Sequence, residues 1–173
     1  MDQKPALLGG APAFPDGLPL MRPKAPNVEQ LTPFLAEMEE SGYLSNFGPI
    51  STRYETALAE RLEVKHCLAL SNLSTGLMSM PIAAGLEGGE VIVPSFTFSA
   101  TAHSMLLGGL TPVFADIDPD TLCLDPTSVK AAVTSETVAV CGVHLYGTPC
   151  DIDALEEVCV KHNLALFFDS AHA

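Results

Sequence analysis

The chemically most suggestive residues of this chain are its last five, Asp169-Ser170-Ala171-His172-Ala173. They follow the apolar run 164–168, which is typical of a buried parallel strand. Open α/β sheets bind ligands beyond the carboxyl ends of their strands. Because a carboxylate is costly to bury unless it is paired, Asp169 is a candidate binding residue, with capping of a following helix as the alternative. His172 is either a hydrogen-bond donor or a helix-surface residue.

Polar and aromatic segments also follow three other apolar runs, at residues 71–76, 94–98 and 144–147. In the first segment, small polar residues enter a helix, whose free amides and dipole favour a phosphate. The alternative is that Ser74 or Thr75 only caps that helix. The segment lacks the glycine spacing of a Walker loop or a dinucleotide fingerprint. Phe96 and Phe98 are candidates for the core or for stacking on a planar heterocycle.

Alternating helices and strands are needed to position these segments. Apolar runs predict strands at 66–71, 90–94, 111–117, 137–143 and 164–168. Helical patterns follow at 28–41, 52–63, 74–86, 97–107, from Pro126 after the cap Asp125, and at 151–162. Five strands separated by helices predict an α/β fold, with a mostly parallel, doubly wound sheet and helices on both faces.

The N-terminal part has a different composition. Prolines recur at positions 5, 12, 15, 19, 23 and 26, with Pro33 just beyond. Proline fixes the backbone and removes a donor, so residues 1–30 are predicted to form an extended N-terminal arm. Residues 31–173 would form the globular part.

Composition excludes several classes of function. The 173 residues carry 8 Lys and Arg against 21 Asp and Glu, a net charge of −13, which argues against nucleic acid and anionic lipid as partners. An anionic small ligand stays possible, because local amides can override the global charge. Five cysteines without a Cys-x-x-Cys pair and an N-terminus unlike a signal peptide indicate the cytoplasm. Neither a metal-ligand spacing nor a Gly-x-Ser-x-Gly elbow is present.

Together, the loops resemble the large domain of fold-type-I pyridoxal-phosphate (PLP) enzymes, and more narrowly the DegT/StrS-type PLP-dependent nucleotide-sugar aminotransferase family. Four stretches carry the match in the family's order: SNLSTGL (71–77), EVIVPSFTF (90–98), PVFADIDP (112–119) and VHLYGTPCD (143–151). The C-terminal Asp-Ser-Ala-His resembles the family's Asp-Ala-Ala-His/Gln segment. The resemblance implies a partial PLP-binding large domain over 31–173, without its closing strands and the small C-terminal domain.

The resemblance also implies roles for single residues. In the family, backbone amides of the first loop hold the cofactor phosphate, and Ser74 and Thr75 stand there. Phe98 matches the aromatic residue that stacks on the pyridine ring. Asp169 matches the acid that pairs with the pyridine nitrogen and keeps it protonated, so that the ring acts as an electron sink. His172 matches the residue that approaches the ring hydroxyl.

Two features depart from the family's pattern. Leu73 stands where many members have Gly. The family's Schiff-base lysine is expected downstream of residue 173, and none of the lysines at positions 4, 24, 65, 130 and 161 falls at its place. We therefore assign no catalytic residue within the chain and expect it to be the inactive front portion of a longer protein.

The resemblance implies an aminotransferase that takes an amino group from an amino acid such as glutamate and passes it to a nucleotide-linked keto-sugar. It also implies a homodimer. Two alternatives stay open. One is a sugar dehydratase of the same family, in which a histidine replaces the lysine. The other is a non-catalytic binding or regulatory protein on this scaffold.

Overall fold

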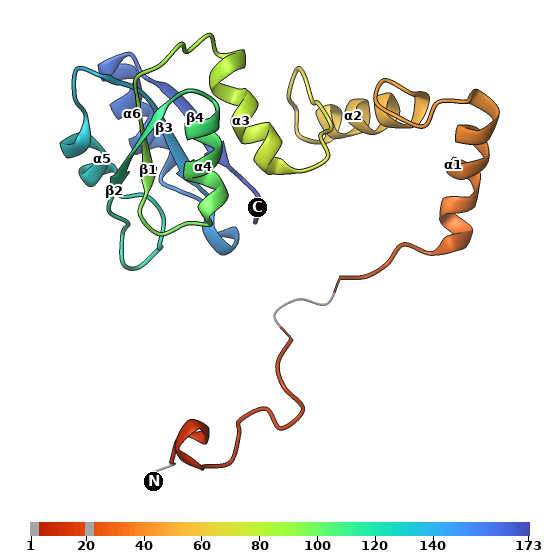
Figure 1. The fold of residues 1–173 in the computed structure, drawn as a ribbon, viewed down its shortest axis with the longest axis horizontal. Coiled ribbons are helices and arrows are strands. Elements are labelled where there is room, and N and C mark those ends of the chain that lie inside the picture. The colour runs from red at the N-terminus through yellow and green to blue at the C-terminus, as the bar shows by residue number, and fades with distance from the viewer. Residues whose placement is uncertain (1–3, 20–22) are drawn as a thin grey trace. The chain divides into compact units, whose positions relative to one another are not determined.

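The computed structural model describes residues 4–19 and 23–173 (Figure 1). The chain divides into two compact units, Met1–Ala69 and Leu70–Ala173. The second unit contains the sheet and the polar segments singled out above.

Helices and strands alternate in the second unit. In chain order they are α3 (Leu73–Ala83), β1 (Glu90–Pro94), α4 (Ser99–Leu107), β2 (Thr111–Ala115), α5 (Pro126–Ala132), β3 (Thr137–Val143), the 3-10 helix η2 (Leu145–Gly147), α6 (Ile152–His162) and β4 (Ala165–Asp169). The sheet has the order β2-β1-β3-β4, and its paired strands are parallel. Strand order reverses between β1 and β3, the kind of switch point at which open α/β sheets bind ligands.

Helices cover both faces of this sheet (Figure 1). On one face, α3 and α4 pack around a core that includes Leu77, Val91 and Met105. On the other face, α5 and α6 pack around Ile92 and Leu155. Successive residues of a strand point to opposite faces, so Val91 and Ile92 belong to different cores. The predicted doubly wound α/β fold is confirmed.

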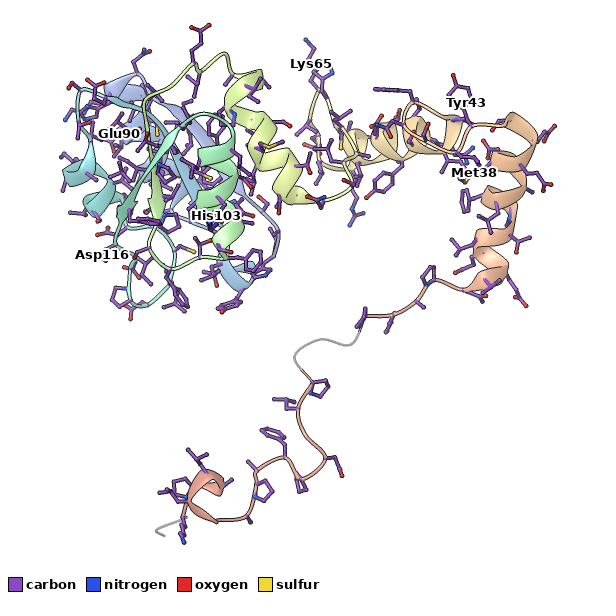
Figure 2. The ribbon with its side chains drawn as sticks, in the orientation of Figure 1. Met38, Tyr43, Lys65, Glu90, His103 and Asp116 are labelled. Carbon is purple, nitrogen blue, oxygen red and sulfur yellow. The ribbon has the colours of Figure 1, made fainter. Side chains whose placement is uncertain are left out.

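Local signals begin the helices of this unit. The carboxylate of Asp125 accepts hydrogen bonds from the amides of Thr127 and Ser128, at 2.9 and 3.2 Å, and so caps α5 as predicted. Asp151 caps α6 by accepting from the amide of Ala154. Such caps satisfy amides that have no partner within the helix. In Figure 2, Glu90 and Asp116 mark the two ends of the sheet, where β1 begins and where β2 has ended.

The first unit contains the 3-10 helix η1 (Ala6–Leu8), α1 (Val28–Ser41) and α2 (Pro49–Arg61). Apart from η1, its described residues before Val28 form no helix or strand and are almost all exposed. Residues 1–3 and 20–22 of the predicted arm lie outside the described residues. A paired contact of Arg53 with Glu37 joins α2 to α1. Within the described ranges, no helix is long and apolar enough to cross a membrane.

The strand predicted at residues 66–71 is wrong, because this segment pairs with no strand in the part of the chain that the structure describes. Leu68 and Leu70 are 63% and 47% exposed. The amide of Ala69 instead donates to the carboxylate of Glu55, at 2.9 Å. A short apolar run predicts burial but supplies no neighbouring strand, and without one its backbone groups find other partners.

Candidate active site

A cavity of about 170 Å³ lies at the carboxyl edge of the sheet. Its wall combines the start of α3, the segment after β1, the ends of β3 and β4 and the residues after β4. The parallel register pairs Val143 at the end of β3 with Asp169 at the end of β4, so their loops leave the sheet together. Of the predicted site residues, Ser74, Phe98, Asp169 and His172 line this cavity.

Asp169 is the buried charged group of this wall, and it is only 5% exposed. Its Oδ2 accepts a hydrogen bond from the hydroxyl of Thr101 on α4, at 2.7 Å. Its Oδ1 accepts from the amide of Ala171, at 3.1 Å. Each carboxylate oxygen therefore has a donor from the protein and keeps further acceptor capacity. The carboxylate is held in a fixed orientation at the cavity.

The first two residues of α3, Leu73 and Ser74, line the same cavity. Asn72 caps the helix, because its Oδ1 accepts from the amide of Thr75 at 2.9 Å and from the Thr75 hydroxyl at 3.1 Å. The alternative in which Ser74 or Thr75 is the cap is therefore wrong. Ser74 lines the cavity, and its carbonyl accepts from Ser104 on α4 at 3.0 Å. Thr75 is half-buried, and its polar groups already contact Asn72.

Phe96 and Phe98 lie in the segment between β1 and α4. Phe98 is 72% exposed and borders the cavity, and Phe96 is 44% exposed. Both rings, with Thr97, Tyr146 and His172, line a second hollow of about 270 Å³ that shares part of its wall with the first. Neither ring is buried in the core, so the core-packing alternative fails for both.

His172 is held by the loop after β3. Its Nδ1 accepts from the amide of Tyr146 at 3.2 Å, and the two rings stack with centroids 5.5 Å apart. Because a backbone N–H donates to Nδ1, the neutral imidazole carries its hydrogen on Nε2. Tyr146 adopts a left-handed backbone, with φ 52°, which is uncommon for a residue with a side chain. The loop therefore accepts a strained conformation while it orients His172.

His144 serves packing. Its ring stacks on Phe168 with centroids 4.8 Å apart, and its Nδ1 accepts from the amide of Cys150 at 3.1 Å. Gly142 on β3 lets Phe168 and Cys150 pack closely against the strand, because a Cβ at position 142 would lie 3.0 Å from the Phe168 ring and 3.1 Å from the sulfur of Cys150. This cluster fixes the path of the chain after β3, which in turn places Tyr146.

A neutral thiol lies beside the Asp169 carboxylate. Burial, together with the charge of Asp169, raises the pKa of Cys141 to about 12. The thiol is therefore protonated at neutral pH and adds no second negative charge to the site. The lysines of this unit, Lys130 and Lys161, line a separate hollow between α5 and α6. Among the described residues, no cluster of three or more His, Cys, Asp and Glu side chains is placed to hold a metal ion.

Sequence reasoning missed three polar residues of this region. Asn72 is a common N-cap type, so its position before the helix could have identified it. Thr97 and Thr101 carry no such signal, because the Thr101–Asp169 contact joins residues 68 positions apart. Only the fold brings α4 and the end of β4 together.

Comparison with known proteins places the chain in a family. A model of the DegT/DnrJ/EryC1/StrS aminotransferase family matches residues 27–173. The dTDP-4-amino-4,6-dideoxy-D-glucose transaminase of Shigella dysenteriae is 40% identical over 152 residues, which are 88% of this chain and 41% of that protein. The chain thus spans about two-fifths of the length of such curated relatives.

Solved structures show the same fold. The crystal structure of DesI in the presence of its TDP-sugar product has a TM-score of 0.87 and 48% identity, covering 97% of this chain and 43% of that one. NtdA from Bacillus subtilis with bound PMP has a TM-score of 0.77 and 32% identity, covering 82% of this chain and 32% of that one. The family match extends over most of the chain, including every segment that lines the cavity. The chain belongs to the DegT/DnrJ/EryC1/StrS aminotransferase family.

Proposed function

We propose that the protein containing this chain is a PLP-dependent aminotransferase that passes an amino group from an amino acid such as glutamate to a nucleotide-linked keto-sugar. Membership in the family supports the reaction class. The names of the Shigella transaminase and of the DesI complex support a nucleotide-linked sugar as the substrate class. The described part of the chain would supply one wall of the cofactor site.

The observation that carries this proposal is the Asp169 carboxylate. It is buried at the carboxyl edge of the sheet, both oxygens are held by neutral donors, and it lines a cavity. These neutral donors do not cancel the charge of the buried carboxylate, which a cationic partner in the cavity would stabilise. The protonated nitrogen of a pyridine ring is such a partner, so the wall fits PLP. The charge of Asp169 would keep that nitrogen protonated.

The phosphate would bind at the start of α3. Ser74 is the second residue of the helix, where the amide has no carbonyl partner within the helix. Its amide and hydroxyl, with the helix dipole, favour an anion there. Thr75 would bind the phosphate only by giving up its contacts with Asn72. We therefore assign the main contact to Ser74 and a lesser one to Thr75.

Two further side chains would fix the ring. The exposed Phe98 has a free face on which a planar ring can stack. The Nε2–H of His172 would donate to the ring hydroxyl, with Tyr146 keeping the imidazole in place. These contacts would hold the ring at one height and one rotation above the end of the sheet.

Bound PLP supplies an electron-withdrawing ring and an aldehyde carbon that receives the amino group. The described residues would bind and orient it and exclude water from its buried edge. Lys130 and Lys161 lie away from the cavity, so the second unit offers no amine for covalent attachment. We infer that residues 1–173 alone do not catalyse transamination.

We further propose that the complete protein is a cytoplasmic homodimer. Apolar side chains on α1, such as Leu31, Phe34 and Leu35, are 37%, 44% and 57% exposed. A second copy would cover such surface in a symmetric assembly. The five cysteines are all unpaired, which fits a reducing compartment.

The full-length gene product tests the proposal when it is loaded with PLP and mixed with glutamate. We expect the cofactor to be converted to pyridoxamine phosphate, which its absorbance reports. We also expect 2-oxoglutarate to be released. An Asp169→Ala variant should lose this conversion, whereas Asp153→Ala on the exposed side of α6 should keep it. A wild-type protein that binds PLP but never yields pyridoxamine phosphate would refute the aminotransferase assignment.

A further inference from the structure

Two threonine hydroxyls lead to the Asp169 carboxylate. The hydroxyl of Thr101 donates to Asp169 Oδ2 at 2.7 Å, and the hydroxyls of Thr97 and Thr101 lie 2.8 Å apart. A threonine hydroxyl has one hydrogen to donate. Since Thr101 gives its hydrogen to Asp169, Thr97 must be the donor to Thr101. The chain of donors therefore runs from Thr97 through Thr101 to Asp169.

Thr101 makes an unusual contact for a threonine within a helix. Helical threonines commonly donate to the carbonyl four residues earlier, as Thr32 does to Val28 and Thr56 to Thr52, both at 2.9 Å. Thr101 instead contacts a strand 68 positions away and is 0% exposed. A buried hydroxyl is costly without a partner, and a valine would fill nearly the same space. The presence of a hydroxyl at this place is explained by Asp169.

Both donors to Asp169 are electrically neutral. The Thr101 hydroxyl holds Oδ2 and the Ala171 amide holds Oδ1. Neutral donors fix the plane of a carboxylate without cancelling its charge, whereas a lysine or arginine would neutralise it. The lysines of this unit, Lys130 and Lys161, line a hollow between α5 and α6. The charge of Asp169 is thus left for a cationic partner in the cavity.

We propose that Thr101 is a positioning residue for Asp169 and that Thr97 orients the Thr101 hydroxyl. This inference rests on the proposed function. The two threonines fix the carboxylate, so that its remaining acceptor capacity would be available to the ring nitrogen of the cofactor. Hydrogen bonds in such a chain polarise one another, so loss of the Thr101 hydroxyl should weaken the contact with the ring more than loss of the Thr97 hydroxyl.

The test uses the full-length protein loaded with PLP that carries ¹⁵N at the ring nitrogen. The ¹⁵N chemical shift reports protonation of that nitrogen, and a separate titration gives the dissociation constant for PLP. Thr101→Val should weaken PLP binding about tenfold, the loss typical of one hydrogen bond to a charged group. It should also move the ¹⁵N signal toward that of unprotonated pyridine. Thr101→Ser, which keeps the hydroxyl, should restore both readouts.

Two further variants complete the test. Thr97→Val should move the signal in the same direction by a smaller amount. Thr127→Val is the matched control, because Thr127 is exposed on α5, which packs on the opposite face of the sheet. It should change neither readout. If Thr101→Val does not fold, Thr97→Val decides by itself, and a wild-type ¹⁵N signal in that variant would overturn the proposal.

A Thr101→Val protein with a lower melting temperature but the wild-type ¹⁵N signal and PLP affinity would also overturn it, since Thr101 would then be structural only. A wild-type protein that binds no PLP is a different result, because it refutes the proposed function together with this inference. If the wild type binds PLP, but no more tightly than Thr101→Val does, the result refutes this inference and leaves the proposed function untouched.

Discussion

Leu155 on α6 and Leu35 on α1 are both leucines in amphipathic helices, yet Leu155 is 0% exposed and Leu35 is 57% exposed. In residues 70–173, helices lie on both faces of a sheet, and two clusters of buried apolar residues form. In the described residues before position 70, neither α1 nor α2 buries a residue. An apolar pattern every three to four residues predicts a helix, but burial of that pattern depends on what packs against it.

The largest expected effect is that of truncating Leu155 in the 173-residue chain, and the same truncation of Leu35 is the comparison. Leu155→Ala removes atoms from a closed core and should lower the free energy of unfolding by about 2–5 kcal/mol. Leu35→Ala removes atoms of a side chain that is more than half exposed and should cost about 0.5 kcal/mol or less. Urea unfolding, monitored by circular dichroism, measures the free energy of unfolding of both variants. Equal losses would show that the units do not differ in packing as described.

Two glycines with positive φ sharpen the comparison. Gly89 precedes β1 with φ 97°, and a Cβ there would lie 2.6 Å from a methyl group of Val138 and 2.8 Å from the carbonyl of Glu136. Gly42 ends α1 with φ 67°, and nothing lies within 4 Å of its Cβ position. Gly89→Ala should cost about 2–4 kcal/mol, because steric overlap adds to backbone strain. Gly42→Ala should cost about 1 kcal/mol, from strain alone.

Thermal melts of the two glycine variants, compared with wild type, measure this difference. A Gly89→Ala protein as stable as Gly42→Ala would mean that the loop before β1 can move away from Val138 without cost.

Buried thiols make the stability of the second unit depend on pH. Burial raises the pKa of Cys141 from 9.0 to about 12 and that of Cys159 to about 11. Above about pH 9 the unfolded chain loses thiol protons that the folded chain keeps, so stability falls as pH rises toward 12. Between about pH 8 and about pH 10.5, Cys141 should account for roughly 2 kcal/mol of this fall.

A Cys141→Ala variant should therefore lose less stability over that interval than wild type, by about the same amount. Urea unfolding at both pH values measures it. Identical pH dependence in the two proteins would rule out Cys141 as a source.

The smallest expected effect is that of the ion pair in the first unit. Arg53 contacts Glu37 through two hydrogen bonds, but the side chains are 54% and 34% exposed. Water and salt screen exposed pairs, so Arg53→Ala should cost about 1 kcal/mol or less, and the loss should shrink at high salt. Melting temperatures at low and high salt check this, and a loss that persists in high salt would indicate packing of Arg53 on Phe34 instead.

Much of the fold follows from local signals in the sequence. Helix 28–41 and strands 90–94 and 137–143 have the predicted bounds, because caps, glycines and continuous apolar runs mark their ends. The strand predicted at 66–71 failed, because strand formation depends on a neighbour that the run itself does not specify. In α1, likewise, the apolar pattern predicts the helix, but it does not predict that apolar side chains of this helix stay exposed.

The candidate site was predictable where it depends on position along a strand. Asp169 could be singled out because it directly follows an apolar run, and the fold then places it at the carboxyl edge. Its partner Thr101 could not, since their contact spans 68 positions. The Tyr146 conformation that holds His172 likewise depends on tertiary contacts rather than on residue type.

The central claim is that Asp169 anchors a cofactor in the cavity of the second unit. The most direct measurement is a PLP titration of the full-length wild-type protein, Asp169→Asn and the exposed control Asp153→Asn. Asp169→Asn keeps the shape and removes the charge, so it should bind PLP ~100-fold more weakly, while Asp153→Asn should match wild type. Equal affinities for wild type and Asp169→Asn would contradict the account.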